Sequence, residues 1–104
     1  MRILLAEDEK ALSKALAAIL ERNNYSVDTV YDGQSALDYL EMDNYDGVIL
    51  DIMMPRMDGL TVLRKVREKG NRIPILLLTA RSEVDDKVAV SYTHLRAHET
   101  RHDL

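Results

Sequence analysis

The chain has 104 residues, the usual length of a single domain. Its 18 acidic and 14 basic residues give a formal charge of −4, so nothing in its electrostatics favours direct nucleic-acid binding. The absence of cysteine excludes disulfides and thiol chemistry, and no apolar run approaches membrane-spanning length. These features are typical of a globular domain that works in the cytoplasm, away from membranes.

Strand and helix patterns alternate along the chain. Short apolar runs predict strands over residues 2–6, 25–31, 48–51 and 73–78. Apolar residues at helical spacing predict helices over residues 11–20, 36–40 and 60–66. Asp32 is expected to cap the second helix, and Gly70 to end the third. Strands and helices that alternate with short connections are typical of an α/β, doubly wound parallel sheet with helices on both faces.

Polar residues stand at the ends of three predicted strands: Glu7 and Asp8, Asp51, and Thr79. If the first and third strands are neighbours, their ends lie about 5 Å apart. Carboxylates that close repel one another, so one must hold a proton or a cation must lie between them. Mg²⁺ suits such oxygen ligands, and a carboxylate beside it can attack phosphorus to form an acyl phosphate.

Three motifs give the chain a specific resemblance to a known family. They are Ile3-Leu4-Leu5-Ala6-Glu7-Asp8-Glu9, Asp46-Gly47-Val48-Ile49-Leu50-Asp51-Ile52-Met53-Met54-Pro55-Arg56-Met57-Asp58-Gly59 and Pro74-Ile75-Leu76-Leu77-Leu78-Thr79-Ala80. Residues 1–90 resemble the receiver domain of bacterial two-component response regulators. The residues of these motifs are most similar to those of the subfamily that carries a winged-helix DNA-binding domain, which this chain lacks.

The resemblance implies a role for each matching residue. Asp51 would accept a phosphoryl group from a sensor histidine kinase. Mg²⁺ would be held by Glu7, Asp8, Asp51 and the backbone carbonyl of Met53. Thr79 would be the switch hydroxyl that follows the phosphoryl group. Such a domain is a phosphoacceptor in phosphorelay signalling and not an enzyme in its own right. The family sheet is parallel, with strand order 2-1-3-4-5.

The resemblance stops near residue 90. Family members continue with a fifth strand that bears an aromatic residue, a lysine that neutralises the phosphate, and a fifth helix. Here residues 91–104 form a different tail, as if the domain were truncated and followed by unrelated sequence, and no lysine follows Lys87. Counted without gaps, His98 falls on the aromatic position and Arg101 on the lysine position. Arg101 is not equivalent to lysine at a point-charge site.

The tail leads to two structural expectations. A capping box at Ser82-Glu83-Val84-Asp85, with Val88 and Leu95 at helical spacing, predicts a fourth helix that continues through residue 91 toward residue 100. The sheet would then have order 2-1-3-4, with the fifth strand and fifth helix missing or replaced. Residues 75–78 would form an exposed apolar edge, and we expect self-association through this edge or the long helix.

Two alternative functions follow from the tail. The first is a receiver-like module that self-associates without phosphorylation. The second is a zinc site, because His98-Glu99-Thr100-Arg101-His102 has the H-E-x-x-H form and His94 lies one helical turn earlier. Glu99 would then be the general base. Chance occurrence in an unselected tail is the competing interpretation of these histidines.

Overall fold

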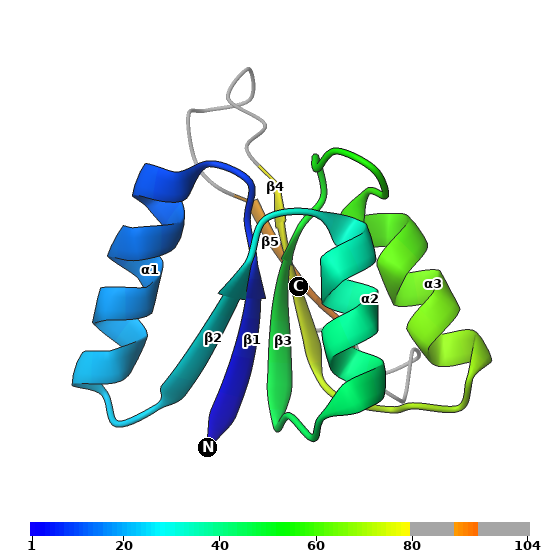
Figure 1. The fold of residues 1–104 in the computed structure, drawn as a ribbon, viewed down its shortest axis with the longest axis horizontal. Coiled ribbons are helices and arrows are strands. Elements are labelled where there is room, and N and C mark those ends of the chain that lie inside the picture. Colours follow the sequence, from blue (N-terminus) through cyan, green and yellow to red (C-terminus); the bar gives the residue numbers. More distant parts are fainter. Residues whose placement is uncertain (80–88, 94–104) are drawn as a thin grey trace.

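The computed structural model describes residues 1–79 and 89–93, and of residues 89–93 it describes the backbone. Five strands form one sheet in the order β2-β1-β3-β4-β5 (Figure 1). The strands are β1 (Arg2–Ala6), β2 (Ser26–Val30), β3 (Gly47–Asp51), β4 (Ile75–Thr79) and β5 (Ala89–Thr93). The helices are α1 (Lys10–Arg22), α2 (Gly33–Met42) and α3 (Gly59–Glu68). The four strands β1 to β4 run parallel, which confirms the predicted order 2-1-3-4.

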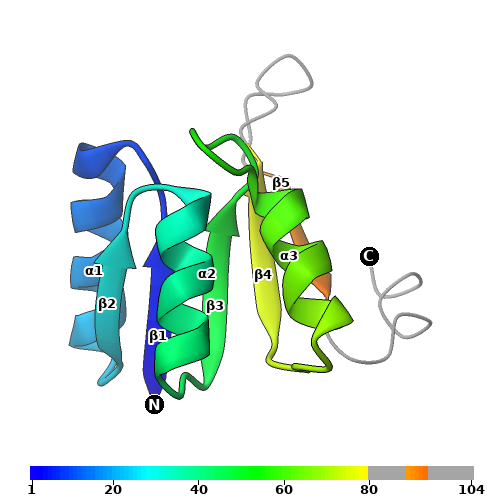
Figure 2. The same cartoon turned by 45° about the vertical axis from the view of Figure 1, so that its right-hand side comes forward.

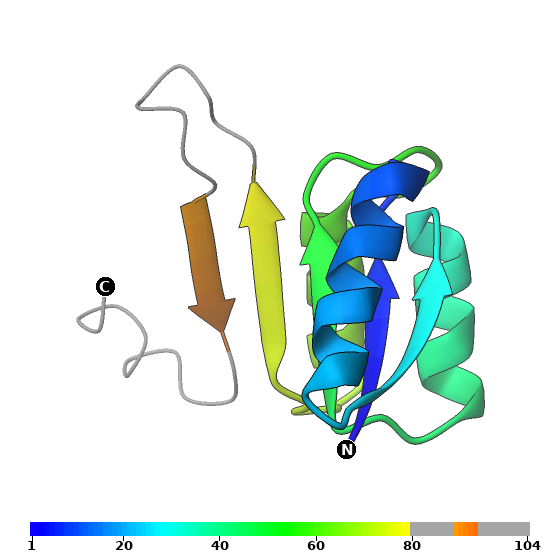
Figure 3. The same cartoon turned by 90° about the vertical axis from the view of Figure 1, so that its left-hand side faces the viewer.

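The hydrophobic core lies between the sheet and the layer formed by α2 and α3, which lie side by side over one face (Figure 2). Leu4 and Leu50 of the central strands are fully buried, as is Val62 of α3. Alternate residues of β1, β3 and β4 point to the opposite face, where α1 packs on β2 and β1 (Figure 3). Ile49, Leu76 and Leu78 on that face are only half-buried. The two faces of the sheet are therefore covered unequally by the described helices.

Aspartates begin two of the three helices in the described part of the chain. The side chain of Asp32 accepts a hydrogen bond from the amide of Ser35 at 2.7 Å, as the sequence predicted. The side chain of Asp58 accepts one from the amide of Thr61 at 2.8 Å. Each bond satisfies an amide that has no partner within its helix, and it holds the pKa of each aspartate below the usual value. The connections after β2 and β3 are thus fixed where they enter α2 and α3.

Replacing Asp58 with alanine is expected to lower the free energy of unfolding by about 1 kcal/mol, because the amide of Thr61 loses its acceptor. Asparagine caps a helix about as well as aspartate, so Asp58→Asn is the matched control and should change it by a few tenths of a kcal/mol. Urea denaturation of the two variants measures both values. Equal losses would show that the charge of Asp58, and not its capping bond, stabilises α3.

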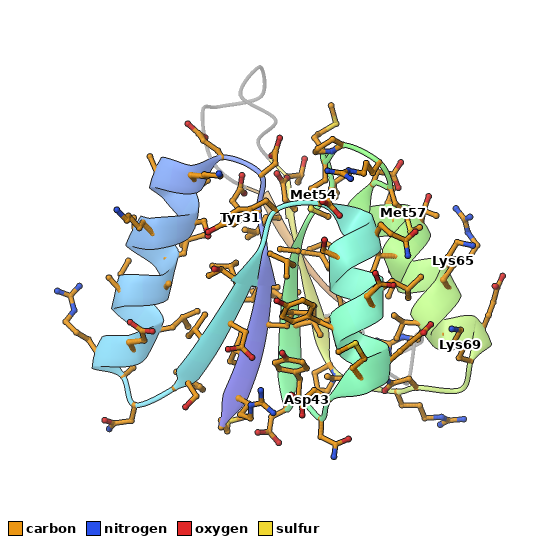
Figure 4. The ribbon with its side chains drawn as sticks, in the orientation of Figure 1. Tyr31, Asp43, Met54, Met57, Lys65 and Lys69 are labelled. Carbon is orange, nitrogen blue, oxygen red and sulfur yellow. The ribbon has the colours of Figure 1, made fainter. Side chains whose placement is uncertain are left out.

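A polar cluster lies at the end of the sheet where the strands β1 and β2 begin. Arg2 pairs with Asp28 and with Asp43, each at 2.9 Å, and its guanidinium lies 4.6 Å from the centre of the Tyr45 ring. The Tyr45 hydroxyl donates to Asp28 at 2.6 Å. Asp43 marks this end in Figure 4. Every acidic group of the cluster therefore has a donor, as expected of a structural network.

The fourth helix was wrongly predicted to continue through residue 91. Residues 89–93 instead form β5, which pairs antiparallel with β4 (Figure 3). The connection spans residues 80–88, and a crossover to a parallel strand needs a dozen or more residues, so the shorter link favours the antiparallel direction. The sequence Ala89-Val90-Ser91-Tyr92-Thr93 also alternates in the manner of a strand, a pattern that competed with the helical one. The rest of the expected helix lies outside the described residues.

The expected exposed edge is also corrected. β4 lies between β3 and β5, and residues 75–79 each pair with a residue of β5. The fifth position of the sheet is thus filled by a strand of reversed direction, in agreement with a replaced fifth strand and not with a missing one. Self-association through an unpaired β4 edge loses its structural basis.

Candidate functional site

The carboxyl ends of β1, β3 and β4 bring the predicted polar residues together. Glu7 and Asp8 follow β1, Asp51 is the last residue of β3, and Thr79 is the last residue of β4. Parallel pairing aligns Ala6 with Leu50 and Asp51 with Leu78, so the strands end almost level. One carboxylate oxygen each of Glu7, Asp8 and Asp51 lies within 4.8 Å of the others. The meeting of acidic groups that the sequence predicted is present.

These residues line a cavity of about 460 Å³, which we call the acidic cavity. Asp51, Met53 and Thr79 all contribute to its wall. Sequence reasoning missed its apolar side, formed by Leu12 and Leu16 of α1 and by Leu78. Among the residues that the structure describes, the lining consists of Glu7, Asp8, Glu9, Leu12, Leu16, Asp51, Met53, Leu78 and Thr79. The helical spacing of Leu12 and Leu16 placed them on one face of α1 but did not indicate that this face borders the acids.

Glu7 is the most deeply buried of the three acids, with 3% of its surface exposed. Burial, reinforced by the negative charges of Asp51 and Asp8, raises the pKa of Glu7 to about 7. The amide of Glu9 donates to Glu7 Oε2 at 2.9 Å and opposes this rise. No lysine or arginine of residues 1–79 forms an ion pair with the three acids, in contrast to the Arg2 cluster at the other edge. The site therefore holds negative charge that a proton or a cation would relieve.

Asp51 is half-buried, which raises its pKa above the usual value. The amide of Met53 donates to Asp51 Oδ1 at 3.2 Å, and this bond lowers the pKa in opposition to burial. The bond also orients the carboxylate at the start of the loop that leads to α3. Asp51 is thus fixed by its own loop while facing the acidic cavity.

The loop of residues 52–58 closes on itself beside Asp51. The amide of Gly59 donates to the carbonyl of Ile52 at 2.9 Å. A Cβ on Gly59 would lie 3.0 Å from both the carbonyl carbon of Asp51 and the Cα of Ile52, so this close approach requires glycine. Met54 and Met57 pack against the core at the end of the molecule where α2 begins (Figure 4). Met53, by contrast, is 74% exposed at the cavity.

Several predicted residues lie outside the described part of the chain. They are Arg101, considered as a replacement for the family lysine, and the three histidines of the zinc motif, His94, His98 and His102. Among the residues that the structure describes, the group of Glu7, Asp8 and Asp51 is the cluster whose ligand atoms are close enough to hold a metal ion. No helix among them is long and apolar enough to cross a lipid bilayer.

Comparison with known proteins defines the class. A family described as "Response regulator receiver domain" matches residues 3–98, so the chain belongs to this family. It is a phosphoacceptor domain of two-component signalling and not a member of a conventional enzyme family. The match extends past residue 90, where the resemblance was expected to stop.

The curated relatives are longer proteins. The chain is 49% identical over 88 residues to the transcriptional regulatory protein DltR of Streptococcus agalactiae, covering 85% of this chain and 39% of the relative. It is 47% identical over 89 residues to the response regulator MprA of Mycobacterium avium, with coverage of 86% and 39%. The chain thus spans about two fifths of the length of these relatives.

Solved structures show the same fold. The response regulator TrrA of Thermotoga maritima, in complex with Mg²⁺ and BeF, has a TM-score of 0.75 and 40% identity, and the match covers 81% of this chain and 73% of that one. The receiver domain of the sensor histidine kinase PA1611 of Pseudomonas aeruginosa, with magnesium in its active-site cleft, has a TM-score of 0.74 and 36% identity, with coverage of 82% and 71%.

Proposed function

We propose that this domain accepts a phosphoryl group on Asp51 with the help of Mg²⁺ in the acidic cavity. The observation that carries the proposal is the convergence of the carboxylates of Glu7, Asp8 and Asp51, whose oxygens lie within 4.8 Å of one another. Asp51 is the member of the three that ends a strand and is oriented by an amide, that of Met53. Thr79 lines the same cavity on the neighbouring strand.

The donor set fits a hard divalent cation. Mg²⁺ prefers six oxygen ligands at about 2.1 Å, which places opposite ligands about 4.2 Å apart. The three carboxylate oxygens lie within 4.8 Å of one another, so they would have to draw together around the ion. Glu7, Asp8 and Asp51 would supply carboxylates, and the backbone carbonyl of Met53 would supply a neutral oxygen. The bound ion would offset the charge of the acids and of the incoming phosphoryl group.

The chemical step needs a nucleophile, an electrophile and a hydrogen-bond donor. A carboxylate oxygen of Asp51 attacks the phosphorus of the donor, and the bond between phosphorus and the leaving atom of the donor breaks as the new P–O bond forms. The electron pair of the broken bond leaves with the donor. The hydroxyl of Thr79 donates to a phosphoryl oxygen and would respond to its arrival. The phosphoryl group carries about −1.5 to −2 charges, while the Asp51 carboxylate gives up its own negative charge in the new P–O bond.

The partner we propose is a sensor histidine kinase in the cytoplasm. Membership of the receiver family supports a phosphoryl donor of this class, and the magnesium held by TrrA and PA1611 supports the metal in the same fold. The relatives DltR and MprA are named as regulators, and a role in transcription regulation for a longer form of this chain is part of the same proposal.

The test is phosphoryl uptake from a small acyl phosphate. With Mg²⁺, intact-mass measurement is expected to show the gain of one phosphoryl group on a fraction of the chains. With a chelator in place of Mg²⁺, the gain should disappear. A chain that stays unmodified in Mg²⁺, while folded by circular dichroism, would contradict the proposal.

A further inference from the structure

We propose that the start of α2, where the N-cap Asp32 and the first helical residue Gly33 form the Asp32–Gly33 turn, is a positioning element for the loop of residues 52–58. The turn contacts the loop at Pro55, Arg56 and Met57, and the loop in turn sets the backbone amide of Met53 beside the Asp51 carboxylate. This inference rests on the proposed function for its consequence at the metal site. The mechanical part, that one connection fixes the shape of the other, stands on contacts between described residues.

The first contact is between backbones. The amide of Gly33 faces the carbonyl of Pro55 at 3.5 Å. A Cβ on Gly33 would overlap the carbonyl oxygen of Met57 and would lie 2.6 Å from its carbonyl carbon and 2.7 Å from its Cβ. Two of these atoms belong to the backbone and cannot rotate away. Any side chain at position 33 must therefore displace either the loop or the start of α2.

The second contact is between charges. Asp32 is 9% exposed, and its Oδ2 lies 3.6 Å from Nη2 of Arg56. Arg56 has φ of 68°, in the left-handed region that few side chains adopt without support. The other carboxylate oxygen of Asp32 caps α2 through the amide of Ser35. One aspartate thus connects the first turn of α2 with the strained residue at the tip of the loop.

Two backbone hydrogen bonds within residues 52–59 make the loop move as a unit when one part of it is displaced. Its two ends are joined by the bond from the Gly59 amide to the Ile52 carbonyl at 2.9 Å. Within it, the amide of Met57 donates to the carbonyl of Pro55 at 2.7 Å. A loop tied at its base and tightly turned at its tip has few independent motions. Displacing Met57 should therefore alter the path that carries Met53 past Asp51.

The test is the variant Gly33→Ala. Amide hydrogen exchange is expected to become faster at Met53 and Gly59, and Mg²⁺ titration to show affinity weakened by roughly tenfold or more, as for other supporting groups around metal sites. Gly70→Ala is the matched control. Gly70 has φ of 83° and nothing within 4 Å of an added Cβ, so this variant is strained but touches no loop. It should lose stability while keeping wild-type exchange at Met53 and wild-type Mg²⁺ affinity.

A second variant keeps the inference testable if Gly33→Ala fails to fold. Asp32→Asn retains the cap on α2 but removes the charge that faces Arg56, so α2 should persist while loop exchange rises a few-fold. If Asp32→Asn folds and its amide exchange at Met53 and Gly59 equals that of the wild type, the inference is overturned. If the wild type binds no Mg²⁺, the proposed function fails, and the exchange measurements still decide whether the turn positions the loop.

Discussion

Replacing Asp51 with asparagine is expected to reduce phosphoryl uptake to background. The amide is nearly the same size as the carboxylate and can accept the bond from the Met53 amide, but it is a far poorer nucleophile toward phosphorus. Intact-mass analysis after incubation with an acyl phosphate and Mg²⁺ measures the result. Asp38→Asn is the matched control, since Asp38 is an exposed aspartate on α2, and it should accept phosphoryl groups as the wild type does.

Loss of uptake in Asp51→Asn could also follow from weaker metal binding, because Asp51 is one of the three proposed carboxylate ligands. Asp8→Asn separates the two explanations. It removes an exposed ligand but leaves the proposed nucleophile, so its uptake should recover as the Mg²⁺ concentration is raised. Asp51→Asn should not recover at any Mg²⁺ concentration. Recovery in both variants would mean that the phosphoryl group goes elsewhere.

In the absence of metal, the stability of the protein is expected to fall as the pH rises from about 4.5 to about 7. The pKa of Glu7 is raised from its usual 4.5 to about 7, because burial disfavours the charged form. Over this interval the folded state holds a proton that the unfolded state has released, so the free energy of unfolding decreases with pH. Full ionisation of Glu7 would cost up to about 3 kcal/mol. The raised pKa of Asp51 contributes with the same sign.

Glu7→Gln tests this directly, because glutamine has a similar shape and no charge to bury. Urea denaturation at pH 5 and pH 8 in a chelator should show the wild type losing stability between the two values, and the variant losing much less. Addition of Mg²⁺ at pH 8 should stabilise the wild type more than the variant, because the ion binds only the folded state. Glu68→Gln, at an exposed position of α3, should follow the wild type in both experiments. A wild type that gains stability toward pH 8 without metal would rule out a buried, protonated Glu7.

The sequence predicted the parallel part of the fold well because its elements have strong local patterns. The strand at residues 2–6 coincides with β1, and the cap at Asp32 is present. Predicting that the acids meet required only the rule that the carboxyl ends of parallel strands share one edge. The family match at residues 3–98 then supports the class of domain that the motifs indicated.

The region after β4 could not be predicted in the same way. Residues 84–95 carry a helical repeat and a strand alternation at once, and the choice depends on pairing with β4, a tertiary effect that periodicity does not contain. The contact of Gly33 with Met57 was equally hidden, because it joins two connections that are far apart in the chain. An Asp-Gly pair predicts a turn, but it does not tell what the turn packs against.

The direction of β5 decides which end of that strand lies beside the acidic cavity. Ala89 stands opposite Thr79 at the cavity, whereas Thr93 stands opposite Ile75. Four residue steps at about 3.4 Å separate Ala89 from Thr93, so the backbone at Thr93 lies some 14 Å farther along the strand from the proposed phosphoacceptor. If the fifth strand were parallel to β4, its last residue would lie at the end of the sheet where Asp51 and Thr79 lie. The direction of β5 thus decides whether its last residue, here Thr93, lies at the end of β4 near Asp51 or at the end near Ile75.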